Sequence, residues 1–220
     1  MLTLSACGDD NSSDDESNTT ENQTTSETNA IANEQEEIEH EVEEEKEEEE
    51  KIDLSNETDA DIIAKQLQKI HDNVSKVTIE DGIAIIVYYD EFVWSETSLF
   101  EDFAIDSITI MKELKDNNNF KGIGFIQKHK MIDQKGNESV DTVIISYFDK
   151  ENYDEINFEN IPSMIYADFS NFYKISNGYW IHPAIYQNVK ESTLNGLSFI
   201  PAETSKGFDT LVDLSENISE

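Results

Sequence analysis

Arginine is missing from this 220-residue chain, whose 15 basic residues are all lysines and stand against 49 aspartates and glutamates. Arginine supplies the planar, two-pronged donors that hold phosphates and read guanine bases. The net charge of −34 would also repel a polyanion, because nucleic acids are bound mainly through neutralisation of their phosphates. We therefore expect no nucleic-acid partner.

Cysteine is almost absent, since Cys7 is the only one in the chain. A disulfide within the chain and a zinc site built from several cysteines are therefore excluded. No stretch approaches the ~20 apolar residues that a transmembrane helix needs. Any attachment to a membrane must be made by another device.

The residues that lead to the single cysteine read Leu4-Ser5-Ala6-Cys7. They resemble the lipobox of bacterial lipoproteins, in which an apolar residue and two small residues precede the cysteine that is lipidated. The resemblance implies a diacylglyceryl group on the Cys7 thiol and cleavage by the signal peptidase just before it. It also implies a location on the extracytoplasmic face of the cell membrane. The polar run Gly8–Ser13 that follows is typical of a chain just outside a membrane.

Six residues precede Cys7 and none of them is basic, whereas a signal peptide carries a basic start and ~7–15 apolar residues. We therefore regard residues 1–7 as the remnant of a signal peptide and expect the coding sequence to begin further upstream. The alternative is a cytosolic acidic protein in which Cys7 is an ordinary thiol. An in-frame upstream extension, rich in lysine and apolar residues, distinguishes the two.

An acidic stretch follows, and we assign residues 8–54 to a disordered tether. Residues 1–50 contain 19 acidic residues and one lysine, a net charge of −18, which leaves −16 for residues 51–220. Repulsion between glutamates four residues apart opposes a helix at neutral pH, so we expect an extended, self-repelling spacer. A weak sponge for divalent cations is the alternative, but the run lacks the mixed ligands and sharp turn of a calcium loop.

The pattern changes near Thr58, and we predict one α+β domain over residues 55–220. A first helix is expected to begin at residue 58 or 59 and to end near residue 71. A second begins at Ser95, with a capping box at Ser98 and Glu101. Residues 161–172 are compatible with a short helix, and the last dozen residues are expected to be frayed. Strands are expected over residues 74–80, 83–89, 120–131 and 140–148, and residues 179–183 should be a short extended segment that enters a turn.

Asp81-Gly82 is predicted to form either a hairpin turn or a bulge within one long strand. The strands should form an antiparallel sheet of three to five strands with two helices packed on it, a core large enough to fold without disulfides. The element order, the Gly136-Asn137 hairpin loop and the segment Trp180-Ile181-His182-Pro183 resemble uncharacterised surface lipoproteins of low-GC Gram-positive bacteria. That resemblance implies no particular activity.

Common catalytic patterns, such as H-E-x-x-H, G-x-S-x-G, the P-loop and the dinucleotide-binding glycines, do not occur. We therefore expect no catalytic residues, no metal site and no cofactor. The candidate ligand-binding residues are Tyr89, Trp94, Trp180 and His182, because exposed aromatic side chains supply contact area for a ligand.

Each candidate group also has a purely structural interpretation. Phe92 and Trp94 lie in a segment that is dense in both acids and aromatics, Tyr88 to Glu96. There we favour burial of both rings against the second helix over a binding rim. For His182 we favour a packing or hydrogen-bonding role over a catalytic or metal-binding one.

The sequence favours a membrane-anchored extracytoplasmic lipoprotein, whose domain binds a surface protein, a peptide or a cell-wall component. One alternative is an extracytoplasmic hydrolase that uses His182 and carboxylates. It requires a concave pocket that joins His182 to an acid or a hydroxyl. The second alternative is the cytosolic acidic protein.

Overall fold

The computed structural model describes residues 53–200 and 206–217 of the chain. The anchor predicted at Cys7 and residues 8–52 of the predicted tether lie outside these residues. Leu54 is already buried in the core, and the side-chain amide of Asn117 donates a hydrogen bond of 2.7 Å to its carbonyl oxygen. The folded part therefore includes the last residue that we assigned to the tether.

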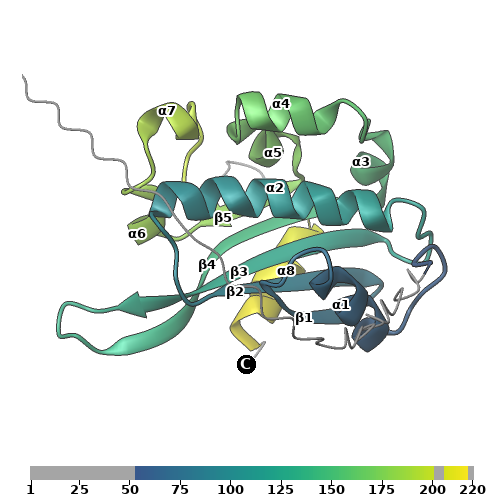
Figure 1. Cartoon of the computed structure of the whole chain (residues 1–220), viewed down its shortest axis with the longest axis horizontal. Helices are drawn as coiled ribbons and strands as arrows, with labels where there is room; N and C mark the ends of the chain where they lie inside the picture. The colour runs from purple at the N-terminus through teal and green to yellow at the C-terminus, as the bar shows by residue number, and fades with distance from the viewer. Residues whose placement is uncertain (1–52, 201–205, 218–220) are drawn as a thin grey trace, which may run out of the picture. The chain divides into compact units, whose positions relative to one another are not determined.

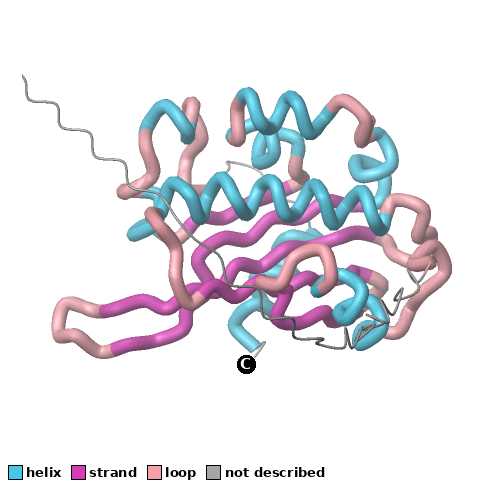
Figure 2. Tube along the Cα trace, viewed as in Figure 1, coloured by secondary structure: helices cyan, strands magenta, loops and turns pink. Residues whose placement is uncertain are grey.

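A five-stranded sheet in the order β1-β2-β3-β4-β5 forms the centre of the described domain (Figures 1 and 2). Three neighbouring pairs are antiparallel, whereas β2 and β3 run parallel. The predicted α+β class is confirmed, and the sheet is mixed rather than antiparallel throughout. The strands are β1 Val74–Glu80, β2 Ile83–Asp90, β3 Gly122–Ile132, β4 Glu138–Asp149 and β5 Gly178–Ile181.

The parallel pair depends on helix α2, Glu96–Leu114, which crosses one face of the sheet between β2 and β3 (Figure 1). Parallel neighbours need such a crossover, because the chain must return to the starting end of the sheet. Ser95 caps α2, and the Ser95 and Ser98 hydroxyls each accept a hydrogen bond from the other's backbone N–H. The capping box predicted at Ser98 and Glu101 is wrong, because Ser98 is already inside the helix.

The first turn and the cap of the first helix agree with alternatives that the sequence offered. Asp81 and Gly82 have φ angles of 52° and 83°, so this pair makes the tight hairpin turn between β1 and β2 rather than a bulge. Helix α1, Ala60–Gln68, begins after Asp59, whose carboxylate accepts hydrogen bonds from the N–H groups of Asp61 and Ile62. The predicted first helix is confirmed, with Asp59 rather than Thr58 as its cap, and it ends at Gln68, before the expected residue 71.

Most helices lie on the same face of the sheet as α2 (Figure 1). The core on this face is rich in aromatic rings and includes Tyr88, Phe103, Phe125 and Tyr173. The cover is larger than the two helices that we predicted. Besides α1 and α2 it comprises α3 Lys150–Glu155, α4 Ile161–Ala167, α5 Ser170–Ile175, α6 Pro183–Tyr186 and α7 Glu191–Leu194.

The opposite face of the sheet carries helix α8, Lys206–Asn217 (Figure 1). Its Phe208 and Leu211 are buried in a second, smaller core with alternate side chains of β2, β3 and β4. The expectation that the end of the chain is frayed is therefore wrong for residues 209–217. The reason is that β2, β3 and β4 all present apolar side chains on this face, among them Ile126 and Ile145, and these need a cover. No helix in the described part of the chain is long and apolar enough to span a membrane.

Candidate ligand-binding site

One edge of the sheet collects the ends of three strands that run in the same direction. β2 is parallel to β3, and β3 and β5 are both antiparallel to β4, so β2, β3 and β5 share a direction. Trp94 lies in the loop after β2, and His182 follows β5 directly. Tyr89 pairs in the register with Lys128, which pairs in turn with Thr142. The topology thus brings all four candidate binding residues toward one edge of the sheet.

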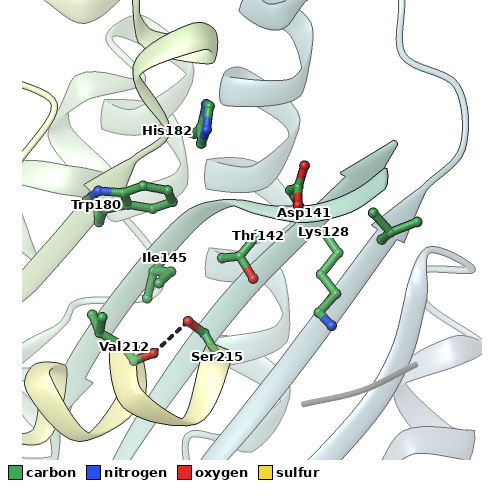
Figure 3. A pocket seen from close by; sticks show the side chains of 9 residues that line it. Lys128, Asp141, Thr142, Ile145, Trp180, His182, Val212 and Ser215 are labelled. Atoms are coloured by element: carbon green, nitrogen blue, oxygen red, sulfur yellow. Dashed lines mark hydrogen bonds between the residues drawn. The ribbon is translucent and has the colours of Figure 1, made fainter. Parts of the chain in front are cut away.

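A hollow of about 610 Å³ opens near this edge, between α8 and the surface of β3, β4 and β5 (Figure 3). It contains two of the predicted residues, Trp180 and His182. Trp94 and Tyr89 are not among its lining residues, although Tyr89 stands beside Lys128 in the register. The predicted residues therefore fall into two groups: Trp180 and His182 line the hollow, and Tyr89 and Trp94 lie outside it. The described residues that line it are Lys128, Val140, Asp141, Thr142, Ile145, Trp180, His182, Val212 and Ser215.

Trp180 and His182 hold each other in a defined arrangement. Their rings meet edge to face, with centroids 5.7 Å apart and planes at 87°. The backbone N–H of His182 donates to the carbonyl oxygen of Val143 (2.8 Å). Its ring Nδ1 accepts a hydrogen bond of 3.1 Å from the N–H of Ala184, which makes His182 the N-cap of α6.

This cap decides what His182 can do chemically. Because Nδ1 accepts a hydrogen bond, the proton of the neutral ring must sit on Nε2. His182 therefore offers an N–H donor at Nε2, and the lone pair on Nδ1 is engaged by the N–H of Ala184. A general base needs such a lone pair within reach of its substrate. The predicted packing or hydrogen-bonding role fits this geometry, and His182 also lines the hollow.

The remaining polar groups of the hollow come from residues that sequence reasoning did not select as a site. Lys128 lies on β3, two residues before the second lysine of that strand, Lys130. The Asp141 carboxylate accepts a hydrogen bond of 2.7 Å from the Ser139 hydroxyl. The Ser215 hydroxyl donates to the carbonyl oxygen of Val212 (2.7 Å), and both residues belong to α8, whose position no local pattern predicts.

The loop after β2 exposes two large aromatic side chains. Phe92 is 74% and Trp94 is 89% exposed, and their rings meet edge to face with centroids 5.6 Å apart. The expectation that both rings are buried against α2 is wrong. Val93 lies between them and packs against the core. The half-buried Val93 thus takes the place in the core that the two aromatic rings leave.

An acidic cluster occupies the helix-covered side of the same edge. Asp106 of α2 lies 3.1 Å from His71 Nδ1 and accepts a hydrogen bond of 2.9 Å from the side-chain amide of Asn73. Asp90 accepts a hydrogen bond of 2.9 Å from the amide of Gln127. Burial raises the pKa of Asp90, and the charge of Asp106 adds to the rise. Within the described residues, no group of histidine and carboxylate side chains is arranged to hold a metal ion.

Replacing Asp90 by asparagine is expected to stabilise the domain at pH 7 and to lose this effect in acid. The folded state raises the pKa of Asp90 above its ordinary 3.8, so the stability linked to its neutral form is present below that value. That stability is lost as the pH rises through the folded-state pKa. An asparagine stays neutral and can still accept the bond from Gln127.

The measurement is urea unfolding of the parent and Asp90→Asn at pH 7 and near pH 4. The exposed Glu80→Gln controls for the simple loss of a negative charge. If the gain in the free energy of unfolding from Asp90→Asn were larger near pH 4 than at pH 7, the raised pKa of Asp90 would be contradicted.

Comparison of the chain with protein-family models, with curated proteins and with solved structures finds no match. Function must therefore be inferred from the residues themselves. Two features of the described domain can contact another molecule, the exposed Phe92–Trp94 pair and the hollow at Trp180. The chemistry of each is considered separately below.

Proposed function

We propose that the chain is a membrane-anchored extracytoplasmic lipoprotein whose domain binds a partner at the cell surface through Phe92 and Trp94. The observation that carries the binding part is the exposure of these two rings. Large aromatic side chains that remain in water on a folded domain gain apolar burial when a partner covers them. Tryptophan is also among the residues that contribute most to protein interfaces.

Charge around the pair favours a basic partner. Asp90 and Glu91 precede the two rings and Glu96 follows them, and the charge of Glu91 contributes to the raised pKa of Lys130. A basic, partly apolar peptide or protein surface would complement this loop, because opposite potentials across an interface speed association and select partners. A cationic group could also stack on the exposed face of Trp94.

The anchor is supported by the lipobox resemblance at Leu4-Ser5-Ala6-Cys7 and by the acidic spacer that follows it. Cells that express the chain with its native upstream region and take up alkyne-tagged palmitate should label the parent protein. Cys7→Ala should carry no label and should leave the membrane fraction. An unlabelled parent in the cytosol would favour the cytosolic alternative, in which Cys7 is an ordinary thiol.

Photo-crosslinking in intact cells tests the binding surface. A benzoylphenylalanine at position 94 should form an adduct of defined mass, and one at position 132 should not. Ile132 is a matched control because its side chain is also apolar and 65% exposed, at the far end of the β3–β4 hairpin. The adduct should weaken when Glu91 and Glu96 are both changed to lysine. Equal adducts at positions 94 and 132 would reject the proposed surface.

A hydrolase that uses His182 is the weaker proposal. In its favour, the hollow joins His182 to the carboxylate of Asp141 and to the hydroxyls of Thr142 and Ser215. Against it, Nδ1 of His182 is engaged by the N–H of Ala184, and the Ser215 hydroxyl donates to its own helix. Neither group is arranged as a base and its nucleophile.

A further inference from the structure

The hollow at Trp180 is a second contact site, and its lining restricts the kind of ligand that it can hold. Five of its nine described lining residues have polar side chains, so a purely apolar ligand would strip water from them without replacing their hydrogen bonds. Lys128 is its only cationic side chain among these residues. A phosphate-bearing ligand would therefore meet one lysine on a domain with a large excess of negative charge.

Trp180 provides a flat apolar surface whose position is already set. Its backbone pairs with Ile145 across the sheet, and its ring is held against His182. Part of the ring packs on the second core, while its remaining surface borders the hollow (Figure 3). Because the Trp180 side chain is already held in place, it loses little conformational entropy when a ligand stacks on its indole ring.

Hydrogen-bond donors and acceptors surround this surface. His182 donates through Nε2–H, and Lys128 contributes an ammonium group. Asp141 accepts through its carboxylate, and the Ser215 oxygen can accept because its hydrogen points to Val212. Figure 3 shows these groups arranged around the hollow, with Trp180 and His182 on one side and Asp141, Thr142 and Lys128 across from them.

A pyranose ring matches this combination. One of its faces presents C–H groups that pack on an aromatic ring, and its rim carries hydroxyls that both donate and accept. The volume of about 610 Å³ lies within the usual range of small-molecule sites. We propose that the hollow binds a neutral saccharide, with one sugar ring stacked on Trp180 and its hydroxyls bonded to His182 and Asp141.

This proposal concerns a different surface from the Phe92–Trp94 pair and depends on neither the anchor nor that pair. The test uses the full 220-residue chain in solution. Trp94 and Trp180 are its two tryptophans, so Trp94→Phe leaves Trp180 as the sole tryptophan reporter. Chitotetraose, cellotetraose and mannotetraose are titrated to about 10 mM, a range that detects weak binding. At least one of them should change the Trp180 emission in a saturable manner.

Variants decide whether the response belongs to the hollow. Trp180→Ala should weaken saccharide binding, measured by calorimetry, by about tenfold or more, since it removes the stacking surface. His182→Asp retains an oxygen acceptor for the cap of α6 but removes the ring and its N–H donor. It should weaken binding by about threefold or more while the fold is kept.

Alanyl-alanine and inorganic phosphate serve as the charged controls and should not bind. The proposal is overturned if none of the three saccharides binds, if a charged control binds in their place, or if Trp180→Ala keeps the parent affinity. Each of these outcomes leaves the cell-surface proposal intact, because that proposal is read from lipid labelling and from adducts at position 94.

Discussion

Tyr173→Ala is expected to lower the free energy of unfolding by about 3–5 kcal/mol, the usual cost of deleting a buried aromatic ring. Tyr173 is 1% exposed and stacks on Phe100 with ring centroids 4.2 Å apart. It also touches Phe172 and Tyr179, so its ring joins α5 to α2 and to the sheet. Since domains of this kind are stable by about 5–15 kcal/mol, this substitution would remove a large fraction of the total free energy of unfolding.

Two variants separate the ring from its hydroxyl. The Tyr173 hydroxyl donates a hydrogen bond of 2.9 Å to the carbonyl oxygen of Phe100, and burial raises its pKa well above its usual range, so it remains a donor. Tyr173→Phe should therefore cost about 1 kcal/mol. Tyr166→Ala, on the exposed face of the neighbouring helix α4, should change stability by about 0.5 kcal/mol or less. Urea unfolding measures all three, and equal losses for the two alanine variants would contradict the assigned core.

Gly178→Val is expected to detach α8 from the sheet while the core on the other face stays folded. A Cβ atom at Gly178 would lie 2.7 Å from Cγ of Phe208, closer than packed atoms approach. Displacing the helix exposes both Phe208 and Leu211, whose burial contributes about 1.5–3 kcal/mol each. Hydrogen exchange should show lost protection over residues 206–217 and retained protection in β3 and β4.

A compensating change makes this prediction specific. Phe208→Ala removes the ring that meets the new side chain, so the double variant should recover part of the protection in α8 that Gly178→Val loses. Such recovery is a non-additive effect, which residues in contact show and distant residues do not. The same loss of α8 should abolish saccharide binding, because Val212 and Ser215 form one wall of the hollow. Unchanged exchange in α8 after Gly178→Val would reject the packing described here.

The strand β2 shows how far the sequence could lead. Its run Ile83–Asp90 is apolar at alternate positions on both faces, which indicates a strand covered on both sides. A strand that is apolar on both faces needs other elements of the chain to pack on its second face as well as on its first. The residues that supply it, Phe208 and Leu211, have helical spacing near the end of the chain, where fraying is the usual expectation. The apolar pattern of β2 is therefore visible in the sequence, but only the tertiary structure shows which helix packs on that face of the sheet.

The two tryptophans illustrate the same division. The sequence marked both Trp94 and Trp180 as candidates, and for Trp94 it favoured burial against the second helix. Trp94 is exposed while Val93 packs against the core, an outcome that the hydrophobicity of the three residues does not predict. Trp180 gained its surroundings from Lys128, Asp141 and Ser215, which lie on three different elements. Long-range contacts of this kind leave no trace in local periodicity.

By itself, the sequence determined the α+β class, the first two helices, the break at Asp81-Gly82 and the β3–β4 hairpin, and it left open whether Asp81-Gly82 is a turn or a bulge. Each of these rests on interactions between residues near one another in the chain, such as caps, turns and alternating burial. The tertiary structure alone decided the parallel pairing of β2 with β3, the docking of α8 and the hollow beside it. Those features follow from how α2 returns the chain across the sheet and from which face remains uncovered, and no short stretch of residues encodes either.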